Sequence, residues 1–164
     1  MNWQNLLQAQ KLRPHRTSPQ EINDLRNLVE RDLQDADIPS LSEDRRFATA
    51  YNSVLQLAKM VIACSGYRVA GPGHHMTTFE ALEIAMGRSV ASFAVYMDTC
   101  RRKRNQVDYD CAHAATDTEA KELVEKAEEF RDHVEVWIRK HHSSYALPDE
   151  QDQASDPKDE SGPH

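Results

Sequence analysis

The chain has 164 residues, three cysteines and a formal net charge of −7. This length allows one domain with a core of its own, and the acidic charge disfavours broad, non-specific coating of nucleic acid. The sequence has no cationic stretch followed by an apolar run at its start and no apolar run long enough to span a bilayer, so we expect neither secretion nor membrane insertion. Cysteines that do not form an even set suit a reducing compartment, and we expect a cytoplasmic protein.

The domain organisation follows from composition. Residues 1–17 are predicted to be a polar segment that is partly helical, and residues 18–145 a single helical domain. Residues 146–164 contain six acidic residues, one lysine and little apolar content, so we expect a disordered acidic tail. The remaining body is close to neutral, which favours a local anion site over tracking along many phosphates.

No segment shows sustained alternation of apolar and polar residues, whereas several show apolar residues at helical spacing. Ser18 and Glu21 form a capping-box pattern that opens one amphipathic helix. Ser40 and Glu43 repeat the pattern before a long helix that we expect to end near Gly66. The predicted fold class is all-α, an antiparallel bundle of four to five helices.

A loop is predicted over residues 66–76, GYRVAGPGHHM, because of its glycines and proline, and Thr77 is expected to cap the next helix. His74 and His75 lie just before that helix N-terminus, where backbone N–H groups attract anions, and Arg68 is in the same loop. We name all three as anion-binding candidates. The alternative is that the histidines are hydrogen-bonded surface residues. The loop lacks the lysine of a Walker A motif, so ATP hydrolysis is not supported.

The next predicted helix, which follows Ser89, runs into the segment RRKRNQVDYD. Holding Arg101, Arg102, Lys103 and Arg104 together costs free energy unless an anion or carboxylates answer them. We therefore name these four as candidates for an anion or nucleic-acid site. Two other interpretations remain open, in which the cations complement the helix dipole or bond to polar residues one turn away on the same helix.

The last predicted helix begins near Thr116 or Thr118 and ends at His141. Its apolar residues recur at intervals of four and three, which predicts a narrow seam for an antiparallel neighbour. They are Leu123, Ala127, Phe130, Val134 and Trp137.

The chain resembles the HEPN (higher eukaryotes and prokaryotes nucleotide-binding) domain superfamily over roughly residues 20–142. The resemblance lies in the segment AYNSVLQLAKMVIACSGYR, the glycine-histidine loop, the helix ending in RRKRNQVDYD and the final amphipathic helix. It implies a helical bundle that forms a homodimer and places an Arg-polar motif from each protomer at a shared cleft. It also implies binding of RNA or nucleotides, in some members as ribonuclease toxins of toxin–antitoxin or defence systems.

The resemblance assigns candidate catalytic residues. Arg104 and Asn105 match the arginine and polar positions, but Tyr109 stands near the place where a histidine is expected. The nearest following histidine, His113, lies nine residues after Arg104. Metal-independent RNA cleavage needs groups that move protons and a cation that stabilises the phosphorane. Arg104 can supply the cation, and His113 can move protons if the helix ends after Tyr109 and the chain turns back.

Two other functions compete with RNA or nucleotide binding. The first is a non-catalytic HEPN protein that binds a nucleotidyltransferase or another protein, which the missing histidine favours. The second is a small-molecule site at the His74–His75 loop that does not depend on Arg104. No metal is expected, because pairs such as Cys111 and His113 do not repeat at ligand spacing, and no cofactor is expected.

Overall fold

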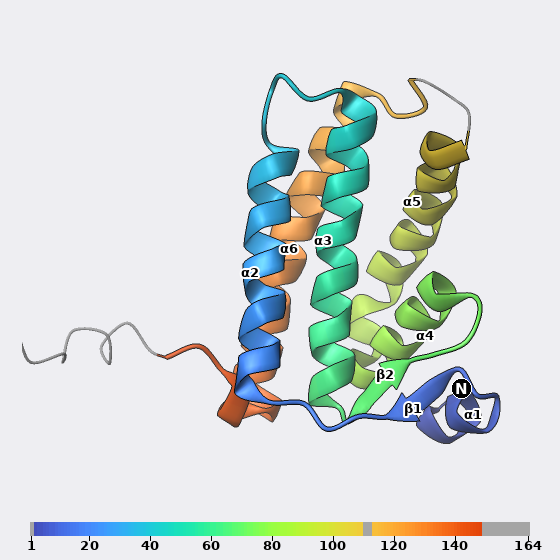
Figure 1. Cartoon of the computed structure of the whole chain (residues 1–164), viewed down its shortest axis with the longest axis vertical. Coiled ribbons are helices and arrows are strands. Elements are labelled where there is room, and N and C mark those ends of the chain that lie inside the picture. The colour runs from blue at the N-terminus through green and yellow to red at the C-terminus, as the bar shows by residue number, and fades with distance from the viewer. Residues whose placement is uncertain (1, 110–112, 149–164) are drawn as a thin grey trace, which may run out of the picture.

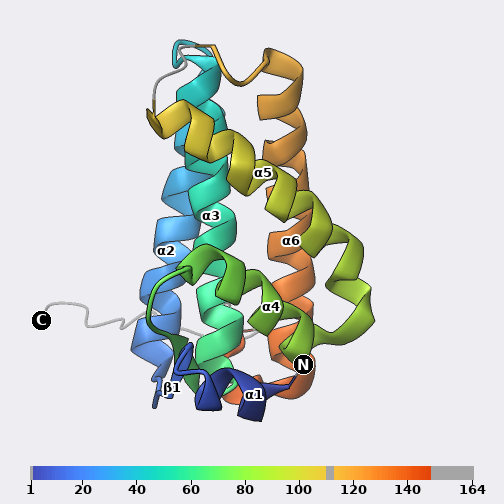
Figure 2. The ribbon, with the colours of Figure 1, turned by 90° about the vertical axis from the view of Figure 1, so that its right-hand side faces the viewer.

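The structure is a computed structural model that describes residues 2–109 and 113–148. Five long helices form a bundle, which confirms the helical fold class: α2 (Pro19–Ala36), α3 (Glu43–Cys64), α4 (His74–Met86), α5 (Ala91–Tyr109) and α6 (Asp117–His141). Helix α3 is central, since it contacts all the other four. Figures 1 and 2 show α2 and α6 beside α3, with α4 and α5 on the side of α3 away from α2.

Helix α6 lies antiparallel to α2, since Arg26 pairs with Glu135 and Glu30 with Arg131, but α2 is not its main neighbour. Its main neighbour is α3, and the first turns of the two helices meet, because Arg46 Nη1 lies 2.9 Å from Asp117 Oδ1. The two helices therefore run parallel (Figure 1). The predicted seam is correct, since Leu123, Ala127 and Phe130 are buried, and Phe130 stacks on Phe93 of α5 with ring centroids 4.4 Å apart.

A small antiparallel sheet lies outside the all-α prediction. Strand β1 (Leu12–Pro14) pairs with β2 (Tyr67–Val69), which occupies the segment expected to be a loop. Strands of three residues are too short to show period-two alternation. Together with helix α1 (Trp3–Gln8), β1 buries Leu6 and Leu12 against α3 and α4, so the N-terminal segment packs onto the bundle.

Two helix starts differ from the prediction. Helix α3 is capped by Ser42, whose hydroxyl accepts from the Arg45 N–H, and not by Ser40. Helix α4 begins at His74 after Gly73, whose φ is +74°, so Thr77 is a buried residue inside the first turns. Both errors arose because a Ser or Thr followed by Glu at the third position occurs by chance near a true start.

Two other caps agree with the prediction. Ser18 caps α2 by accepting from the Glu21 N–H. Thr116 and Glu119 form a reciprocal capping box at the start of α6. The acidic tail prediction lies mostly outside the described residues, which end at 148, after the short 3-10 turn Ser143–Tyr145.

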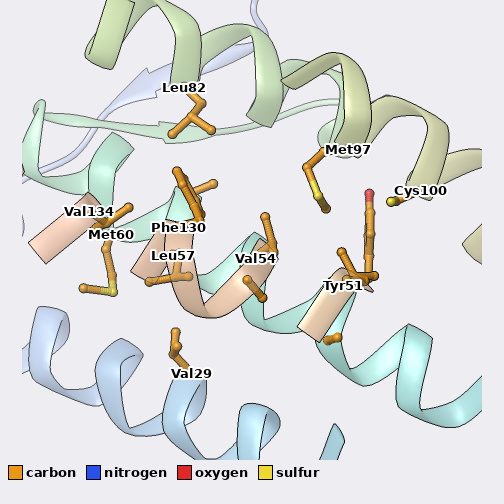
Figure 3. Packing of buried hydrophobic residues seen from close by; sticks show 14 of the residues in the cluster. Val29, Tyr51, Val54, Leu57, Met60, Leu82, Met97, Cys100, Phe130 and Val134 are labelled. Atoms are coloured by element: carbon orange, nitrogen blue, oxygen red, sulfur yellow. The ribbon is translucent and has the colours of Figure 1, made fainter. Parts of the chain in front are cut away.

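The core is centred on the inner face of α3 (Figure 3). Tyr51, Val54 and Leu57 are each at most 1% exposed. Cys64 and Cys100 are buried thiols that pack as small apolar groups. Among the described residues, no helix combines the length and apolar character needed to cross a membrane.

We expect Leu57→Ala to lower the free energy of unfolding by about 2–5 kcal/mol, because it leaves a cavity at the centre of the bundle. Urea unfolding followed by circular dichroism measures the change. The control is Val136→Ala, since Val136 on α6 is 60% exposed and its truncation should alter stability by only about 0.5 kcal/mol. Similar losses for both variants would contradict the central position of α3.

Candidate functional site

Helix α5 carries the basic segment, which we define as residues 101–104, as part of one continuous helix. Figure 2 shows this helix crossing obliquely over the bundle. Successive residues of a helix point about 100° apart, so the four cations cannot all face one ligand. The environment of each cation therefore has to be considered separately.

Three cations of the segment contact carboxylates of the same chain. Arg101 Nε and Arg102 Nη2 each lie 3.0 Å from an oxygen of Asp98. Lys103 Nζ lies 2.6 Å from Glu119 Oε2 on α6. The hydrogen bond from Arg101 is the main reason that the pKa of Asp98 is lowered. Arg101 and Arg102 thus bond to an acidic residue about one turn away on the same helix, and the three pairs offset much of the like-charge repulsion.

Arg104 faces the bundle. Its Nη2 donates to Asn52 Oδ1 at 3.1 Å, and its guanidinium carbon lies 5.3 Å from the centroid of the Tyr51 ring. A guanidinium over an aromatic face gains a cation–π interaction that is stronger where water is partly excluded. Arg104 is half-buried, so two residues of α3 fix the position of its charge.

Tyr51 connects Arg104 to His75. The Tyr51 hydroxyl lies 3.1 Å from His75 Nδ1, and the two ring centroids are 5.6 Å apart. We call Arg104, Tyr51 and His75 the arginine–tyrosine–histidine cluster. It joins α5, α3 and α4, and it brings together two candidates that the sequence placed in separate motifs.

Burial and charge set the protonation of this cluster. Burial raises the pKa of Tyr51, so the phenol keeps its proton at neutral pH. Burial lowers the pKa of His75 from 6.5, and the charges of Arg104 and Arg101 lower it further, so the imidazole is neutral at neutral pH. A tyrosine hydroxyl can both donate and accept, so either tautomer of His75 can keep the bond to Tyr51 and leave Nε2 for a second partner.

This arrangement can perform part of the chemistry of RNA cleavage. A fixed guanidinium suits phosphate oxygens, and a neutral imidazole can accept a proton. The cluster thus supplies one cation and one proton-transfer group on the same surface. The sequence assigned the proton transfer to a histidine that follows Arg104 in the chain. In the structure, His75 of α4 contacts Tyr51, and Arg104 lies over the ring of the same tyrosine.

The catalytic candidates Asn105 and His113 do not join the cluster. Asn105 is exposed on α5. Tyr109 is the last residue of α5, and its side chain lies outside the described part of the structure. His113 follows the helix end in a left-handed conformation, with φ +66°, and its backbone N–H donates to Asp44 Oδ2 at 2.8 Å. The chain does turn back there, but toward the N-terminus of α3, and the His113 side chain is exposed.

Arg68, His74 and His75 line a cavity of about 400 Å³ between α2, α3, β2 and α4. His75 therefore belongs both to the cavity and to the arginine–tyrosine–histidine cluster. The predicted anion-binding residues divide into two neighbouring groups, one on α5 and one at this cavity. Within the α5 group, Arg101 and Arg102 pair with Asp98, and Lys103 pairs with Glu119.

The sequence analysis missed Tyr51 and Asn52. Tyr51 occupies an apolar position of its helix, and the residue is fully buried. A buried tyrosine hydroxyl needs a hydrogen-bond partner. A tyrosine at an apolar helix position therefore predicts a polar group near its hydroxyl. Nothing in the sequence indicated that the partner would be His75, 24 residues away.

No protein-family model, curated protein or solved structure matches the chain. The resemblance to the HEPN superfamily therefore stays a prediction. Within the described residues, no group of three or more His, Cys, Asp or Glu side chains is arranged to hold a metal ion. The candidate site thus has to be judged on its own geometry.

We expect Arg104→Gln to raise the pKa of His75 toward 6.5, because it removes a nearby positive charge that disfavours the imidazolium. An NMR titration of the imidazole protons measures this. Arg102→Gln is the matched control, since Arg102 is 72% exposed and pairs with Asp98. Equal shifts in both variants would contradict the proximity of Arg104 to His75.

The lowered pKa of His75 also makes the stability of the fold depend on pH. The folded-state pKa of His75 is below its usual value, so protons bind more tightly to the unfolded chain. The contribution of His75 to stability is therefore present above pH 6.5 and is lost as the pH falls through that value. Replacing His75 with Asn should reduce the acid sensitivity of thermal unfolding between about pH 7 and pH 5.

Proposed function

We propose that this chain is a cytoplasmic, HEPN-like RNA- or nucleotide-binding protein that holds a phosphate group with Arg104. The observation that carries the proposal is the position of Arg104, half-buried over Tyr51, whose hydroxyl contacts His75. A guanidinium fixed in this way loses little conformational entropy when it binds a phosphate. The cluster combines the charge and hydrogen-bonding groups that a phosphodiester requires.

In the catalytic form of this proposal, the protein is a metal-independent endoribonuclease of the toxin or defence type. Arg104 stabilises the charge that develops on the phosphorane, and His75 transfers a proton in place of the histidine that the motif lacks. The lowered pKa of His75 keeps its imidazole in the neutral form, which is the form that can accept a proton.

The proposal includes a homodimer formed through α4 and α5. Met76 on α4 and Val95 on α5 are 52% and 69% exposed, and both line a hollow of about 270 Å³ between these helices. Asp98, which pairs with Arg101 and Arg102, lines the same hollow. A second copy that covers this face would bring the basic segments of two protomers toward a shared cleft.

A second candidate function is a non-catalytic interaction protein, for example a partner of a nucleotidyltransferase. The observation that favours it is the pairing of Arg101, Arg102 and Lys103 with carboxylates of the same chain. A basic surface that is already paired needs no anionic ligand for its stability. In that case the exposed apolar residues of α4 and α5 would contact a different protein.

We expect Arg104→Ala to weaken binding of single-stranded RNA by tenfold or more, because a hydrogen bond between charged groups contributes about 1.5–3 kcal/mol. Fluorescence anisotropy with a labelled RNA, in EDTA and at two salt concentrations, measures the dissociation constant. Arg131→Ala removes the same charge from α6, where Arg131 pairs with Glu30, and should change binding by less than about twofold.

Cleavage is measured on the same RNA. His75→Asn should abolish cleavage and preserve binding, since Asn keeps hydrogen-bonding capacity but does not transfer protons near neutral pH. Binding that is unaffected by Arg104→Ala would overturn the proposed phosphate site. If the wild-type protein binds RNA without cleaving it, the ribonuclease form of the proposal is wrong and the RNA-binding form stands.

We expect Val95→Glu to convert the dimer into a monomer, because it places a charge in an apolar contact. Size-exclusion chromatography with light scattering measures the mass in solution. Val136→Glu is the matched control, since Val136 is similarly exposed on α6, and it should leave the mass unchanged. A monomeric wild-type protein, or a dimer that only Val136→Glu disrupts, would exclude the proposed interface.

A further inference from the structure

The cavity between α2, α3, β2 and α4 is separate from the face of α5 on which Arg104 lies, although His75 contributes to both. Its volume of about 400 Å³ is within the usual range of sites for small organic ligands. Its lining is divided into an apolar part and a charged part, and each part limits what the cavity can hold.

The apolar part favours a flat body. Leu25, Leu55 and Ile62 provide aliphatic surface from α2 and α3. Tyr67 lines the cavity from β2, and its ring is stacked on Trp3 with a centroid distance of 4.8 Å and an interplanar angle of 24°. A ring that is held by a second ring gives a fixed aromatic wall, and such walls bind nucleobases by stacking.

The charged part favours an anion. Lys59 and Arg68 are exposed and line the cavity, so their charges lie at its mouth. The carboxylate present, that of Glu21, is engaged by His15, whose Nε2 lies 2.8 and 3.0 Å from its two oxygens. His74 adds a further imidazole. Two permanent cations against one carboxylate leave the cavity positive, and more so when its histidines are protonated.

The backbone of α4 adds to this field. His74 and His75 are the first residues of α4, a helix of 13 residues whose N-cap, Gly73, has no side chain to cap it. In the described structure no side chain bonds to that helix end. The positive end of the helix dipole therefore adds to Lys59 and Arg68, and supports an anion at the same mouth.

We infer that this cavity binds a nucleoside monophosphate, with the base against Tyr67 and the aliphatic wall and the phosphate at Lys59 and Arg68. The lining of the cavity by itself indicates a small organic phosphate with a flat apolar body. The choice of a nucleotide among such ligands rests on the proposed function. Because His75 also contacts Tyr51, the bound nucleotide lies next to the arginine–tyrosine–histidine cluster. The cavity is then a base-recognition subsite beside the phosphate held by Arg104.

The test is isothermal titration calorimetry of the full chain with adenosine and uridine 5′-monophosphates, and with inorganic phosphate. Arg68→Ala should weaken nucleotide binding about tenfold or more, because it removes a charge-assisted contact. The matched control is Arg13→Ala, since Arg13 is the cross-strand neighbour of Arg68 on β1 and does not line the cavity. It should change binding by less than about twofold.

A second variant fills the space without changing charge. Leu55→Trp should abolish nucleotide binding, because the indole occupies the apolar part of the cavity, and a thermal melt checks that the variant is folded. Leu55 is only partly buried, so the larger side chain can be accommodated. If Leu55→Trp unfolds the protein, Arg68→Ala against Arg13→Ala still decides the question.

The outcomes separate this inference from the proposed function. Nucleotide binding that Arg68→Ala weakens and Arg104→Ala leaves intact supports the cavity. Binding lost only in Arg104→Ala, or no nucleotide binding by a protein that still binds RNA through Arg104, overturns the cavity and keeps the proposed function. Nucleotide binding in the cavity without any RNA binding keeps the cavity and overturns the RNA site. Equal affinities for inorganic phosphate and both nucleotides would overturn base recognition.

Discussion

The buried ring of Tyr51 connects the core of this bundle to its charged surface. It lies fully buried on α3, packs edge-on against Phe79 of α4 with 6.2 Å between ring centroids, and lies under the guanidinium of Arg104. Its hydroxyl contacts His75. One side chain thus fixes the relative positions of α3, α4 and α5. Any function that combines Arg104 with His75 depends on this packing, because neither residue is held near the other by the chain sequence.

Two kinds of contact reduce the repulsion among the four cations of the basic segment. Arg101 and Arg102 share Asp98 on the same helix, and such exposed pairs contribute little to stability. Arg104 instead lies against α3, where Asn52 and an aromatic face position its charge. Arg104 and Arg101 both lower the pKa of His75, and Arg104 has the larger effect of the two. A cluster that looks uniform in sequence is therefore divided into structural and candidate functional cations.

Local signals in the sequence predicted most of the helices, because caps such as Ser18 and Thr116 act within four residues. They did not predict the sheet, whose strands join residues 12–14 to residues 67–69 and have no periodicity of their own. The candidate site was likewise predicted only in part. Arg104 and His75 were found as individual residues from charge and loop composition, but their proximity depends on how three helices pack. The expected role of His113 rested on sequence distance alone, and the chain carries it toward Asp44 instead.

His75 gives the two neighbouring sites a physical means of influencing each other. Arg104 and Arg101 disfavour its imidazolium form, whereas a phosphate in the adjacent cavity would favour that form. Proton uptake by His75 and anion binding would then be coupled, and thermodynamic linkage makes the coupling equal in both directions. A phosphate bound in the cavity would thus raise the pKa of His75 and change its ability to act as a base beside Arg104. With the cavity filled, a larger fraction of the imidazole would carry a proton, so occupancy of one site would set the protonation state of His75 at the other.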